Sequence, residues 1–376
     1  MSQPDRAVVL GSGGGALTIA AELGLSGVEV TLADLPRFAP GLEPVDAAGG
    51  VNVTFRDQPE LGTRLAPVAA TSTEPASAVA NAPLVIVSVP SFGHRPFAEL
   101  MAPVLEDGQM LIWVGEGGGS FTTVAALREI GRRPALKLGE TNSLPYGGAH
   151  VDGPGSANAM RKTGGTYVAG LPTAVTDDVA AVATGIWPWV ESAANAWETV
   201  LLNFNAIDHV ATMVTNLGWV QGRTGTMLLW GDGASPGVAN VIGAVDDEYT
   251  AMRRALGLPT ELRYEDFLVR QGIVDRKRET IHATIHASLL AEAKFQCGPN
   301  ALEHRFIAED VPYSLVLASS LARELDVSVP VIDGLIAIAS AAARLDYRGD
   351  GRSLADWGLE GAGPGGLLRA VSDGWW

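Results

Sequence analysis

Two residues in this chain, one histidine and one aspartate, could move protons near neutral pH. Histidine has an unperturbed pKa of about 6.5, which suits a general acid or base. His209 closes residues 203–209, early in a predicted long helix, and Asp310 precedes a Val-Pro step at a predicted helix start. Asp310 could orient the imidazole and stabilise its charged form, as in acid–base dyads. It could equally cap its own helix, and His209 could be an ordinary helix residue, so spacing alone leaves the choice open.

A glycine-rich turn near the N-terminus predicts a cofactor site. Residues 7–10 are typical of a buried strand, the helical pattern that follows the turn runs to residue 25, and residues 29–33 form the next strand. Glycines let the backbone approach a pyrophosphate, and a helix N-terminus supplies free N–H groups and the positive end of a dipole. The expected cofactor-binding residues are Gly11, Ser12, Gly13, Gly14, Gly15 and Ala16, with Pro90 at the end of a later strand. A tight strand-to-helix turn without a ligand would show the same pattern.

An acidic residue at the end of the second strand indicates which dinucleotide binds. Asp34 lies about twenty residues past the turn, where a carboxylate can hold both ribose hydroxyls. A 2′-phosphate would meet a like charge there, so Asp34 favours NAD. Arg37 lies three residues further on and could pair with a phosphate, which leaves NADP possible.

Composition narrows the class of protein. At 376 residues the chain is long enough for two domains, and 47% hydrophobic residues supply a full core. The net charge of −16 argues against a nucleic-acid-binding surface. Cys297 is the only cysteine, which excludes a disulfide within the chain and suggests a reducing cytoplasm. No apolar run approaches the ~18 residues of a membrane span, so no membrane partner is expected.

The periodicity of apolar residues changes along the chain and predicts two domains. Residues 1–193 alternate strand-like and helix-like stretches, with the clearest strands at residues 83–89 and 110–114 and weaker ones at 136–139 and 166–169. This is typical of an α/β, Rossmann-type, doubly wound parallel sheet. Residues 194–376 read as an all-helical catalytic domain. The helical patterns there cover residues 200–217, 238–256, 276–293, 314–325 and 331–345.

Other residues of the helical half leave alternatives open. His282 and His286 are four apart on a predicted helix, but the zincin pattern requires Glu directly after the first His, and Ala283 stands there. No metal site is therefore expected. Trp219 and Trp230 lie on apolar segments that could form a homodimer face or simply belong to the core.

Several segments resemble one enzyme family over nearly the whole chain. The match lies in residues 11–16, 139–146, 203–209 and 305–316, and in the tail at 329–333 and 351–359. These segments are similar to the octopine and nopaline dehydrogenases, the opine dehydrogenase family. The resemblance implies that the protein condenses an amino acid with a small 2-oxo acid such as pyruvate. The resulting imine is reduced by NAD(P)H, and the reverse oxidation is also implied.

The same resemblance implies roles for individual residues. His209 would shuttle protons while the carbinolamine forms and loses water, and Asp310 would hold its ring. Arg305 would bind anionic groups of cofactor and substrate, which a planar guanidinium suits. Glu140 and Thr141 match positions that bind the amino-acid substrate, although Glu140 could instead cap the next turn.

One position departs from the family pattern. After the strand at residues 110–114 this chain has Glu116 in a glycine-rich loop, where the family tends to have an uncharged turn. A carboxylate there would disfavour an anion and could attract an amine, so Glu116 is a candidate for tuning the amine donor. It could also be a loop acid that faces solvent.

Two rival functions remain at this point. One is a two-domain reductase of a single keto substrate, of the ketopantoate or glycerol-phosphate type, which would place a lysine near the reacting carbon. Lys137, Lys162, Lys277 and Lys294 lie outside any comparable segment. The other is a non-catalytic NAD sensor, against which His209, Asp310 and Arg305 argue.

Overall fold

The structure, a computed structural model, describes residues 4–222, 228–291 and 299–375. Cys297 lies outside the described residues. The chain divides into two compact units. The first unit runs to Lys162, continues through Thr166–Val200 and includes the C-terminal residues from Ala370, and the second comprises Thr163–Gly165 and Leu201–Arg369.

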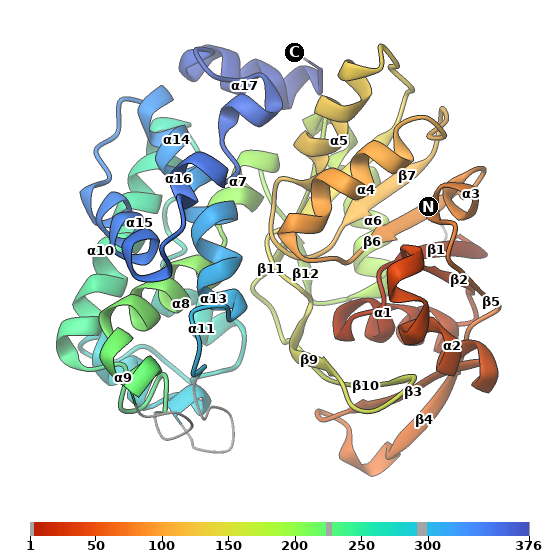
Figure 1. The fold of residues 1–376 in the computed structure, drawn as a ribbon, viewed down its shortest axis with the longest axis horizontal. Coiled ribbons are helices and arrows are strands. Elements are labelled where there is room, and N and C mark those ends of the chain that lie inside the picture. The colour runs from red at the N-terminus through yellow and green to blue at the C-terminus, as the bar shows by residue number, and fades with distance from the viewer. Residues whose placement is uncertain (1–3, 223–227, 292–298, 376) are drawn as a thin grey trace. The chain divides into compact units, whose positions relative to one another are not determined.

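An eight-stranded sheet forms the centre of the first unit (Figure 1). Its strand order is β12-β11-β8-β7-β6-β1-β2-β5. The bounds are β1 (Arg6–Leu10), β2 (Glu29–Ala33), β5 (Ala70–Ser72), β6 (Leu84–Val87), β7 (Met110–Trp113), β8 (Lys137–Thr141), β11 (Thr166–Leu171) and β12 (Val190–Ser192). The pairs are parallel except for β8 with β11. The expected Rossmann-type sheet is confirmed, with this one antiparallel pair added within the described residues.

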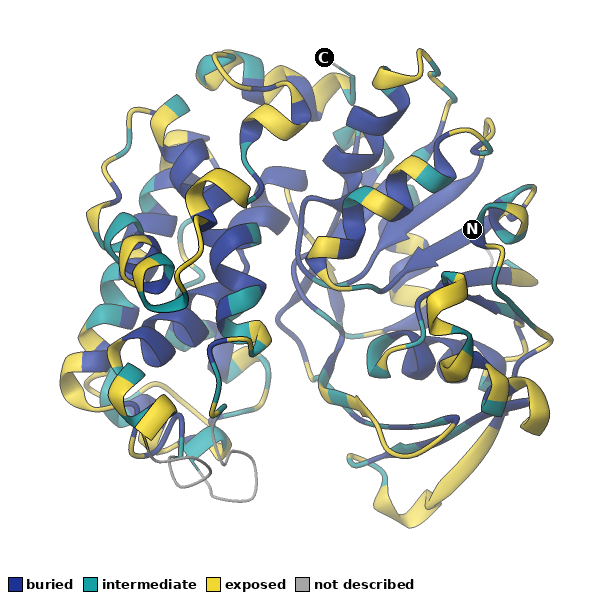
Figure 2. Ribbon diagram, in the orientation of Figure 1, coloured by how far each residue is buried: buried dark blue, intermediate teal, exposed yellow. Residues whose placement is uncertain are grey.

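Burial on both faces explains why these strands were recognisable in the sequence. Every residue of β6 and β7 is buried, and Figure 2 shows the central strands in dark blue. Such strands read as continuous apolar runs. Helices α4 (His94–Met101) and α5 (Gly119–Glu129) pack side by side in this unit, while α1 (Gly14–Leu25) packs against β1 and β2. The unit also contains α2 (Ala39–Ala48), α3 (Pro75–Val79) and α6 (Thr176–Ile186).

A second, four-stranded sheet of order β4-β3-β10-β9 was not predicted. Its strands are β3 (Gly50–Phe55), β4 (Thr63–Pro67), β9 (Tyr146–Val151) and β10 (Ser156–Arg161). β4 is exposed at four of its five positions and β9 contains two glycines, so neither shows the apolar run of a central strand. β3 pairs with β10 about a hundred residues later, which no local pattern reveals. The guanidinium of Arg161 joins this sheet to Glu22 of α1 across 2.8 Å.

The second unit is helical, as expected. Its helices are α8 (Phe204–Thr215), α9 (Leu217–Gly222), α10 (Pro236–Ala255), α11 (Tyr264–Arg270), α12 (Ile281–His286), α13 (Arg305–Ala308), α14 (Val316–Glu324), α15 (Pro330–Ala343) and α16 (Tyr347–Asp350). The link α7 (Ala196–Leu201) and the last helix α17 (Gly363–Asp373) cross the boundary between the units. α8 is buried on nearly all sides and packs against α10 and α13, so its side chains lie in the core of the unit.

One expectation for this half was wrong, and for Trp230 one of two open alternatives is decided. The continuous helix at 276–293 is interrupted, because Thr280 caps α12 by accepting a bond from the Ala283 N–H, and α12 ends at His286. Trp230 is buried, with 3% of its surface exposed, so it belongs to the core rather than to a surface that a second subunit could cover.

None of the helices in the described part of the chain is long and apolar enough to cross a membrane.

Candidate active site

The glycine turn after β1 is packed tightly except at one position. Gly11 has a φ of +114°, which L side chains rarely adopt, and a Cβ there would lie 2.5 Å from the Ser88 carbonyl oxygen. A Cβ on Gly14 would lie 2.4 Å from the Cα of His150, and one on Gly15 would lie 2.8 Å from Oγ of Ser88. Gly13 differs, because no described atom lies within 4 Å of the corresponding position.

This open position is where a pyrophosphate would fit. Gly13 is the N-cap of α1, and among the described residues no side chain caps this helix or places an acid in its first turn. Free N–H groups and the helix dipole therefore face the space beside Gly13, and Ala16 begins the buried part of α1. The strand order also reverses between β1 and β6, which is where open α/β sheets bind dinucleotides. The residues present fit an NAD(P) cofactor.

Asp34 lies against the same turn. Its Oδ2 accepts a 2.6 Å hydrogen bond from the Ser12 hydroxyl, and its Oδ1 accepts one of 2.7 Å from the Leu35 N–H. Burial raises the pKa of Asp34, and these hydrogen bonds oppose that shift. Arg37 is exposed, and its guanidinium lies 4.9 Å from the ring centre of Phe38. Asp34 is thus held at the turn, while Arg37 extends into solvent. The preference for NAD stays a prediction.

The segments that follow β6 and β7 meet through a hydrogen bond between Ser91 and Glu116. Pro90 is exposed and precedes the short turn η3 (Ser91–Gly93). Glu116 is only 6% exposed, and its Oε2 accepts a 3.0 Å hydrogen bond from the Ser91 hydroxyl. The alternative of a loop acid facing solvent is therefore wrong. His94 is also buried, with its ring 4.8 Å from that of Trp113.

Glu140 and Thr141 are engaged within the protein. One oxygen of Glu140 accepts from the Gly118 N–H and the Thr199 hydroxyl, and the other accepts from the Ser120 N–H. These contacts hold the start of α5, which is the capping alternative for Glu140. The Thr141 hydroxyl accepts from the Gly115 N–H and donates to the Ser143 carbonyl. This geometry supports a structural role for both residues, and their role in substrate binding stays a prediction.

His209 and Asp310 lie together in the second unit. Nδ1 of His209 is 2.8 Å from Oδ2 of Asp310, and both side chains are buried. The Asp310 side chain makes no capping hydrogen bond to its own helix, so the capping alternative is not what the structure contains. An ionised Asp310 carboxylate would accept this hydrogen bond from Nδ1–H of His209.

An irregular turn places Asp310. Directly after it comes η6 (Val311–Leu315), a single turn of π-helix, which is frequent at functional sites. Arg352 supports this turn: its backbone N–H donates to the Pro312 carbonyl at 2.9 Å, and its guanidinium donates to the Tyr313 carbonyl, also at 2.9 Å. The tail segment 351–359 thus holds the turn that carries the carboxylate.

Aromatic rings surround the imidazole. Phe306 stacks on His209 with 3.5 Å between ring centres, and Trp230 lies 5.8 Å away. Next to Phe306, the Arg305 side chain is about half exposed and pairs with Glu309 across 3.2 Å. The charged group of Arg305 therefore lies at the surface of the unit. Arg305 directly precedes Phe306, whose ring covers His209.

Sequence reasoning missed Asp208. Its Oδ2 accepts hydrogen bonds from Trp230 Nε1 at 3.1 Å and from the Tyr264 hydroxyl at 2.9 Å. Its Oδ1 lies 3.9 Å from Nε2 of His209. Burial raises the pKa of Asp208 to about 6. The available signal was its position beside His209 in residues 203–209, but only the folded helix shows that it is buried.

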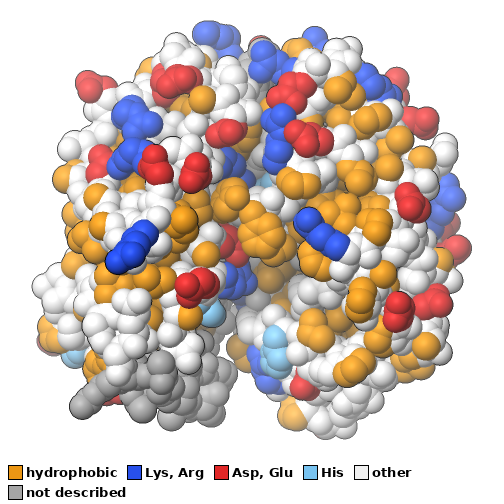
Figure 3. Space-filling model, in the orientation of Figure 1, with side chains coloured by type: hydrophobic (Ala, Val, Ile, Leu, Met, Phe, Trp, Pro, Cys, Tyr) orange, Lys and Arg blue, Asp and Glu red, His pale blue; other side chains and the backbone are white. Residues whose placement is uncertain are grey.

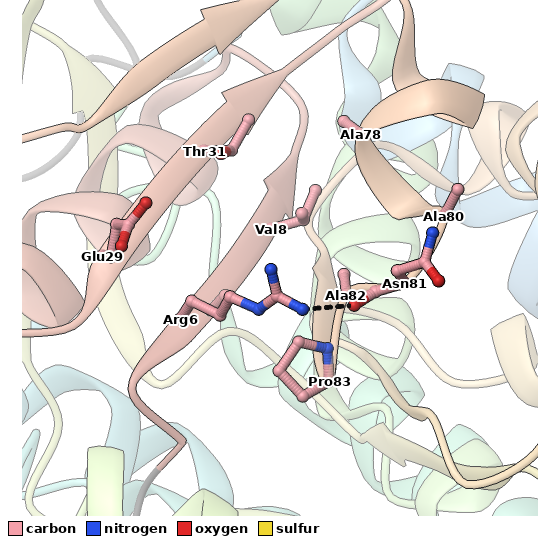
Figure 4. A pocket seen from close by; sticks show the side chains of 10 residues that line it. Arg6, Val8, Glu29, Thr31, Ala78, Ala80, Asn81, Ala82 and Pro83 are labelled. Atoms are coloured by element: carbon pink, nitrogen blue, oxygen red, sulfur yellow. Dashed lines mark hydrogen bonds between the residues drawn. The ribbon is translucent and has the colours of Figure 1, made fainter.

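A small cavity lies at the amino ends of the strands in the first unit's main sheet (Figure 4). It is lined by Arg6, Glu29 and Pro83, which stand at the amino ends of β1, β2 and β6, and Arg6 donates to the Asn81 carbonyl at 2.9 Å. Ligands of open α/β sheets bind at the carboxyl ends of the strands, so this cavity is not the dinucleotide site.

Two further features concern metals and charge. Within residues 4–222, 228–291 and 299–375, no group of three or more His, Cys, Asp or Glu side chains could hold a metal ion. The rings of His282 and His286 lie 4.3 Å apart, and Nε2 of His286 is 3.2 Å from the Ala234 carbonyl.

On the face drawn in Figure 3, basic and acidic side chains are interspersed.

A Rossmann-type unit with an open glycine turn and a helical unit with a buried His–Asp pair define an NAD(P)-dependent dehydrogenase. Residues 192–343 match the family model described as NAD/NADP octopine/nopaline dehydrogenase, alpha-helical domain. The chain is 28% identical over 369 residues to the opine dehydrogenase of Arthrobacter sp. (strain 1C), covering 96% of this chain and 98% of that protein. Residues 192–343 thus resemble the helical domain of that family, and the chain over nearly its whole length is similar to this opine dehydrogenase.

Solved structures show the same fold. Octopine dehydrogenase in its complex with NADH and L-arginine matches with a TM-score of 0.80 at 17% identity, covering 97% of this chain and 98% of that one. A ketopantoate reductase from Ralstonia eutropha JMP134 matches less well, with a TM-score of 0.59 at 18% identity over 90% of this chain and 98% of that one.

Proposed function

We propose that this protein is an opine-type dehydrogenase. It condenses the amine of an amino acid with a small 2-oxo acid such as pyruvate, and NAD(P)H reduces the imine that results. The observation that carries the proposal is the buried contact of 2.8 Å between His209 and Asp310, in the domain that matches the family model. The Arthrobacter relative, named an opine dehydrogenase, supports the same reaction.

His209 supplies the proton transfers. The attacking amine must lose a proton, and the carbinolamine hydroxyl must gain one to leave as water. Nε2 of His209 performs both steps in turn, while Asp310 fixes the ring through Nδ1 and stabilises the imidazolium. Arg305 binds a substrate carboxylate. When bound, the nicotinamide supplies the hydride that reduces the imine.

The cofactor is held at the first unit's glycine turn. The backbone at Gly11, Gly13, Gly14 and Gly15 and the N-terminus of α1 receive the pyrophosphate, with Ser12, Ala16 and Pro90 at its border. Asp34 holds the adenosine ribose hydroxyls and makes NAD the preferred cofactor, while Arg37 leaves room for NADP. A single cysteine in 376 residues fits a cytoplasmic location.

One observation favours a reductase that acts on a single keto substrate. Nζ of Lys162 lies 3.0 Å from the Ser143 hydroxyl, just beyond the carboxyl end of β8, and burial lowers its pKa to about 7. A lysine in that state could protonate a carbonyl oxygen. The opine dehydrogenase hypothesis is preferred because it also explains the contact between His209 and Asp310.

Substrate dependence of NADH oxidation separates these functions. The absorbance of NADH is followed with pyruvate alone, with single amino acids alone, and with both. For an opine dehydrogenase we expect NADH oxidation only when pyruvate and an amino acid are both present. This activity is lost in His209→Ala but not in Lys162→Met. Oxidation with the oxo acid alone, lost in Lys162→Met, would establish the single-substrate reductase. The absence of oxidation across a broad panel would favour an NAD sensor.

A further inference from the structure

The cavity shown in Figure 4 is lined by charged and polar side chains that have no part in the proposed reaction. It has a volume of about 110 Å³ and lies beside the amino ends of β1 and β2 and the segment that follows α3. Its lining includes a cation, Arg6, an anion, Glu29, the hydroxyl of Thr31 and the carboxamide of Asn81. Groups of this kind recognise a small polar ligand.

Arg6 and Glu29 occupy paired positions on neighbouring strands. β1 and β2 run parallel, their register pairs Arg6 with Glu29, and Thr31 lies two residues further along β2. Paired residues point to the same face of a sheet, as do residues two apart in one strand. Arg6, Glu29 and Thr31 therefore share the face that borders the cavity, and a ligand on that face can reach all three side chains.

The two charges on this face are not paired with each other. Opposite charges on neighbouring strands usually attract, but within the described residues Glu29 forms no ion pair and its carboxylate makes no hydrogen bond. Arg6 instead donates through Nη2 to the Asn81 carbonyl oxygen at 2.9 Å, and Figure 4 shows its side chain extending toward Asn81. A cation and an anion are thus held apart at the edge of one cavity.

Separated charges of opposite sign complement a ligand that carries both. Within the part of the chain that the structure describes, the Arg6 guanidinium makes only the bond to Asn81, so its other N–H groups can bind a carboxylate. Glu29 can accept from an ammonium group, and so can the Thr31 hydroxyl, which also has no hydrogen bond to a described residue. The complementary ligand is a zwitterion.

The volume limits that zwitterion to a small one. An engineered cavity of about 150 Å³ binds benzene, so a cavity of about 110 Å³ holds a somewhat smaller ligand. A dinucleotide or a drug-sized molecule needs roughly 300 Å³ or more. The wall opposite the strands carries only short side chains, those of Ala78, Ala80 and Ala82. An amino acid without a long side chain, such as glycine, matches both the charges and the size.

We propose that this cavity is a binding site for a small amino acid of the size of glycine, whose carboxylate pairs with Arg6 and whose ammonium group pairs with Glu29. At about 3.3 Å for each residue of a strand, the five residues of β1 separate Arg6 from the glycine turn by roughly 16 Å. The amino-acid site is therefore distinct from the dinucleotide site of the same unit. It does not depend on the reaction that the protein catalyses.

The test is a titration of the isotope-labelled protein with glycine, followed by NMR in the absence of cofactor. Glycine is expected to shift the backbone amide resonances of Thr31 and Asn81, and the shifts give its Kd. Arg6→Gln and Glu29→Gln each raise this Kd at least about tenfold, because each removes a hydrogen bond between charged groups. Acetate and methylammonium carry one charge each and bind wild type at least about tenfold more weakly than glycine.

Arg64 and Glu43 provide matched controls, because both are exposed residues of the first unit that do not line the cavity. Arg64→Gln and Glu43→Gln remove the same charges and leave the Kd of glycine unchanged. Ala78→Leu keeps both charges of the cavity but fills it, so this variant also binds glycine more weakly. Should Ala78→Leu fail to fold, the charge variants still decide, since Arg6 and Glu29 are exposed.

Three results would overturn the proposal. Glycine that leaves the amide resonances of Thr31 and Asn81 unshifted does not bind in the cavity. A Kd in Arg6→Gln equal to that in Arg64→Gln would show that the guanidinium beside the cavity does not hold the carboxylate. Acetate that binds as tightly as glycine would mean that the cavity recognises an anion alone. Because NADH oxidation is not measured, a failure of the proposed function leaves this test unaffected.

Discussion

Nδ1 of His209 lies 2.8 Å from Oδ2 of Asp310, although 101 residues separate them in the chain. The contact forms because α8 packs against both α13 and the π-helical turn η6. It fixes the ring through one nitrogen and leaves the other for chemistry. This relationship is the basis of the account of catalysis.

Replacing the imidazole is therefore expected to reduce turnover strongly. His209→Ala is expected to lower kcat by a factor of about 10² to 10⁴, the usual contribution of a positioned acid–base group. NADH binding, measured by fluorescence titration, stays unchanged because the glycine turn belongs to the other unit. Near-normal turnover in this variant would refute the assignment.

Asp34 is expected to set the cofactor preference. Wild type is expected to use NADH with a higher kcat/KM than NADPH, because a 2′-phosphate would meet the carboxylate. Asp34→Ala loses a hydrogen bond to a charged group, so kcat/KM for NADH falls about tenfold or more. Arg37→Ala is the companion variant and affects NADPH alone. A strong wild-type preference for NADPH would rule out this role of Asp34.

Glu116 is expected to influence the choice of amine donor. Its buried carboxylate, held by Ser91, attracts a cationic group, so Glu116→Gln is expected to lower kcat/KM for cationic relative to neutral amine donors by about tenfold, or about 1.4 kcal/mol. Ser91→Ala keeps the charge and serves as the control. An unchanged donor profile in Glu116→Gln would eliminate the idea.

Glu140 contributes to folding stability. Gln in its place cannot accept at both oxygens, so Glu140→Gln leaves buried donors at the start of α5 unsatisfied and costs about 2 kcal/mol. Glu129, exposed at the other end of α5, is the matched control, and Glu129→Gln costs less than about 1 kcal/mol. Urea unfolding measures both. Unchanged stability with a raised KM for the amine would instead restore the substrate-binding role.

The pH dependence of stability follows from Asp208. Burial raises the pKa of this carboxyl in the folded protein from 3.8 to about 6, so the folded state binds more protons than the unfolded state between these values. Asp208 therefore costs stability progressively as pH rises from about 4 to about 6, by about 1.4 kcal/mol for each unit of raised pKa. Below that window both states are protonated and the cost disappears.

Urea unfolding of wild type and Asp208→Asn across this range checks the sign. The free energy of unfolding of Asp208→Asn gains on that of wild type as pH rises through the window, then the difference stays constant. A pH-independent difference between the two proteins would show that Asp208 is already ionised in the folded state at pH 4.

The first unit's main sheet was predictable because its strands are buried on both faces. β1, β6 and β7 therefore appear in the sequence as apolar runs. The turn after β1 was recognisable because the positive φ and close packing at Gly11 require glycine there. The smaller sheet was not predictable, since β4 is mostly exposed, β9 contains two glycines and β3 pairs with a strand far away in sequence. A local sequence pattern thus indicates whether a strand is buried, but not which distant strand it pairs with.

The candidate site divides in the same way. His209 and Asp310 were identified by residue type and resemblance, but a cap and a dyad look alike in sequence, and only packing of α8 decides between them. Glu140 looked like a ligand for substrate because its backbone partners at Gly118 and Ser120 are invisible in sequence. Asp208 was missed because only its burial in the folded protein raises its pKa and sets it apart from other aspartates.

The proposed reaction is defined by the new bond between the amine nitrogen and the carbon of the oxo acid. The most direct measurement is mass spectrometry of the product formed from pyruvate, an amino acid and NADH deuterated at C4 on the transferred side. We expect a secondary amine whose mass equals the sum of both substrates minus water, plus one deuterium and one proton. Deuterated lactate, formed equally well without the amino acid, would contradict it.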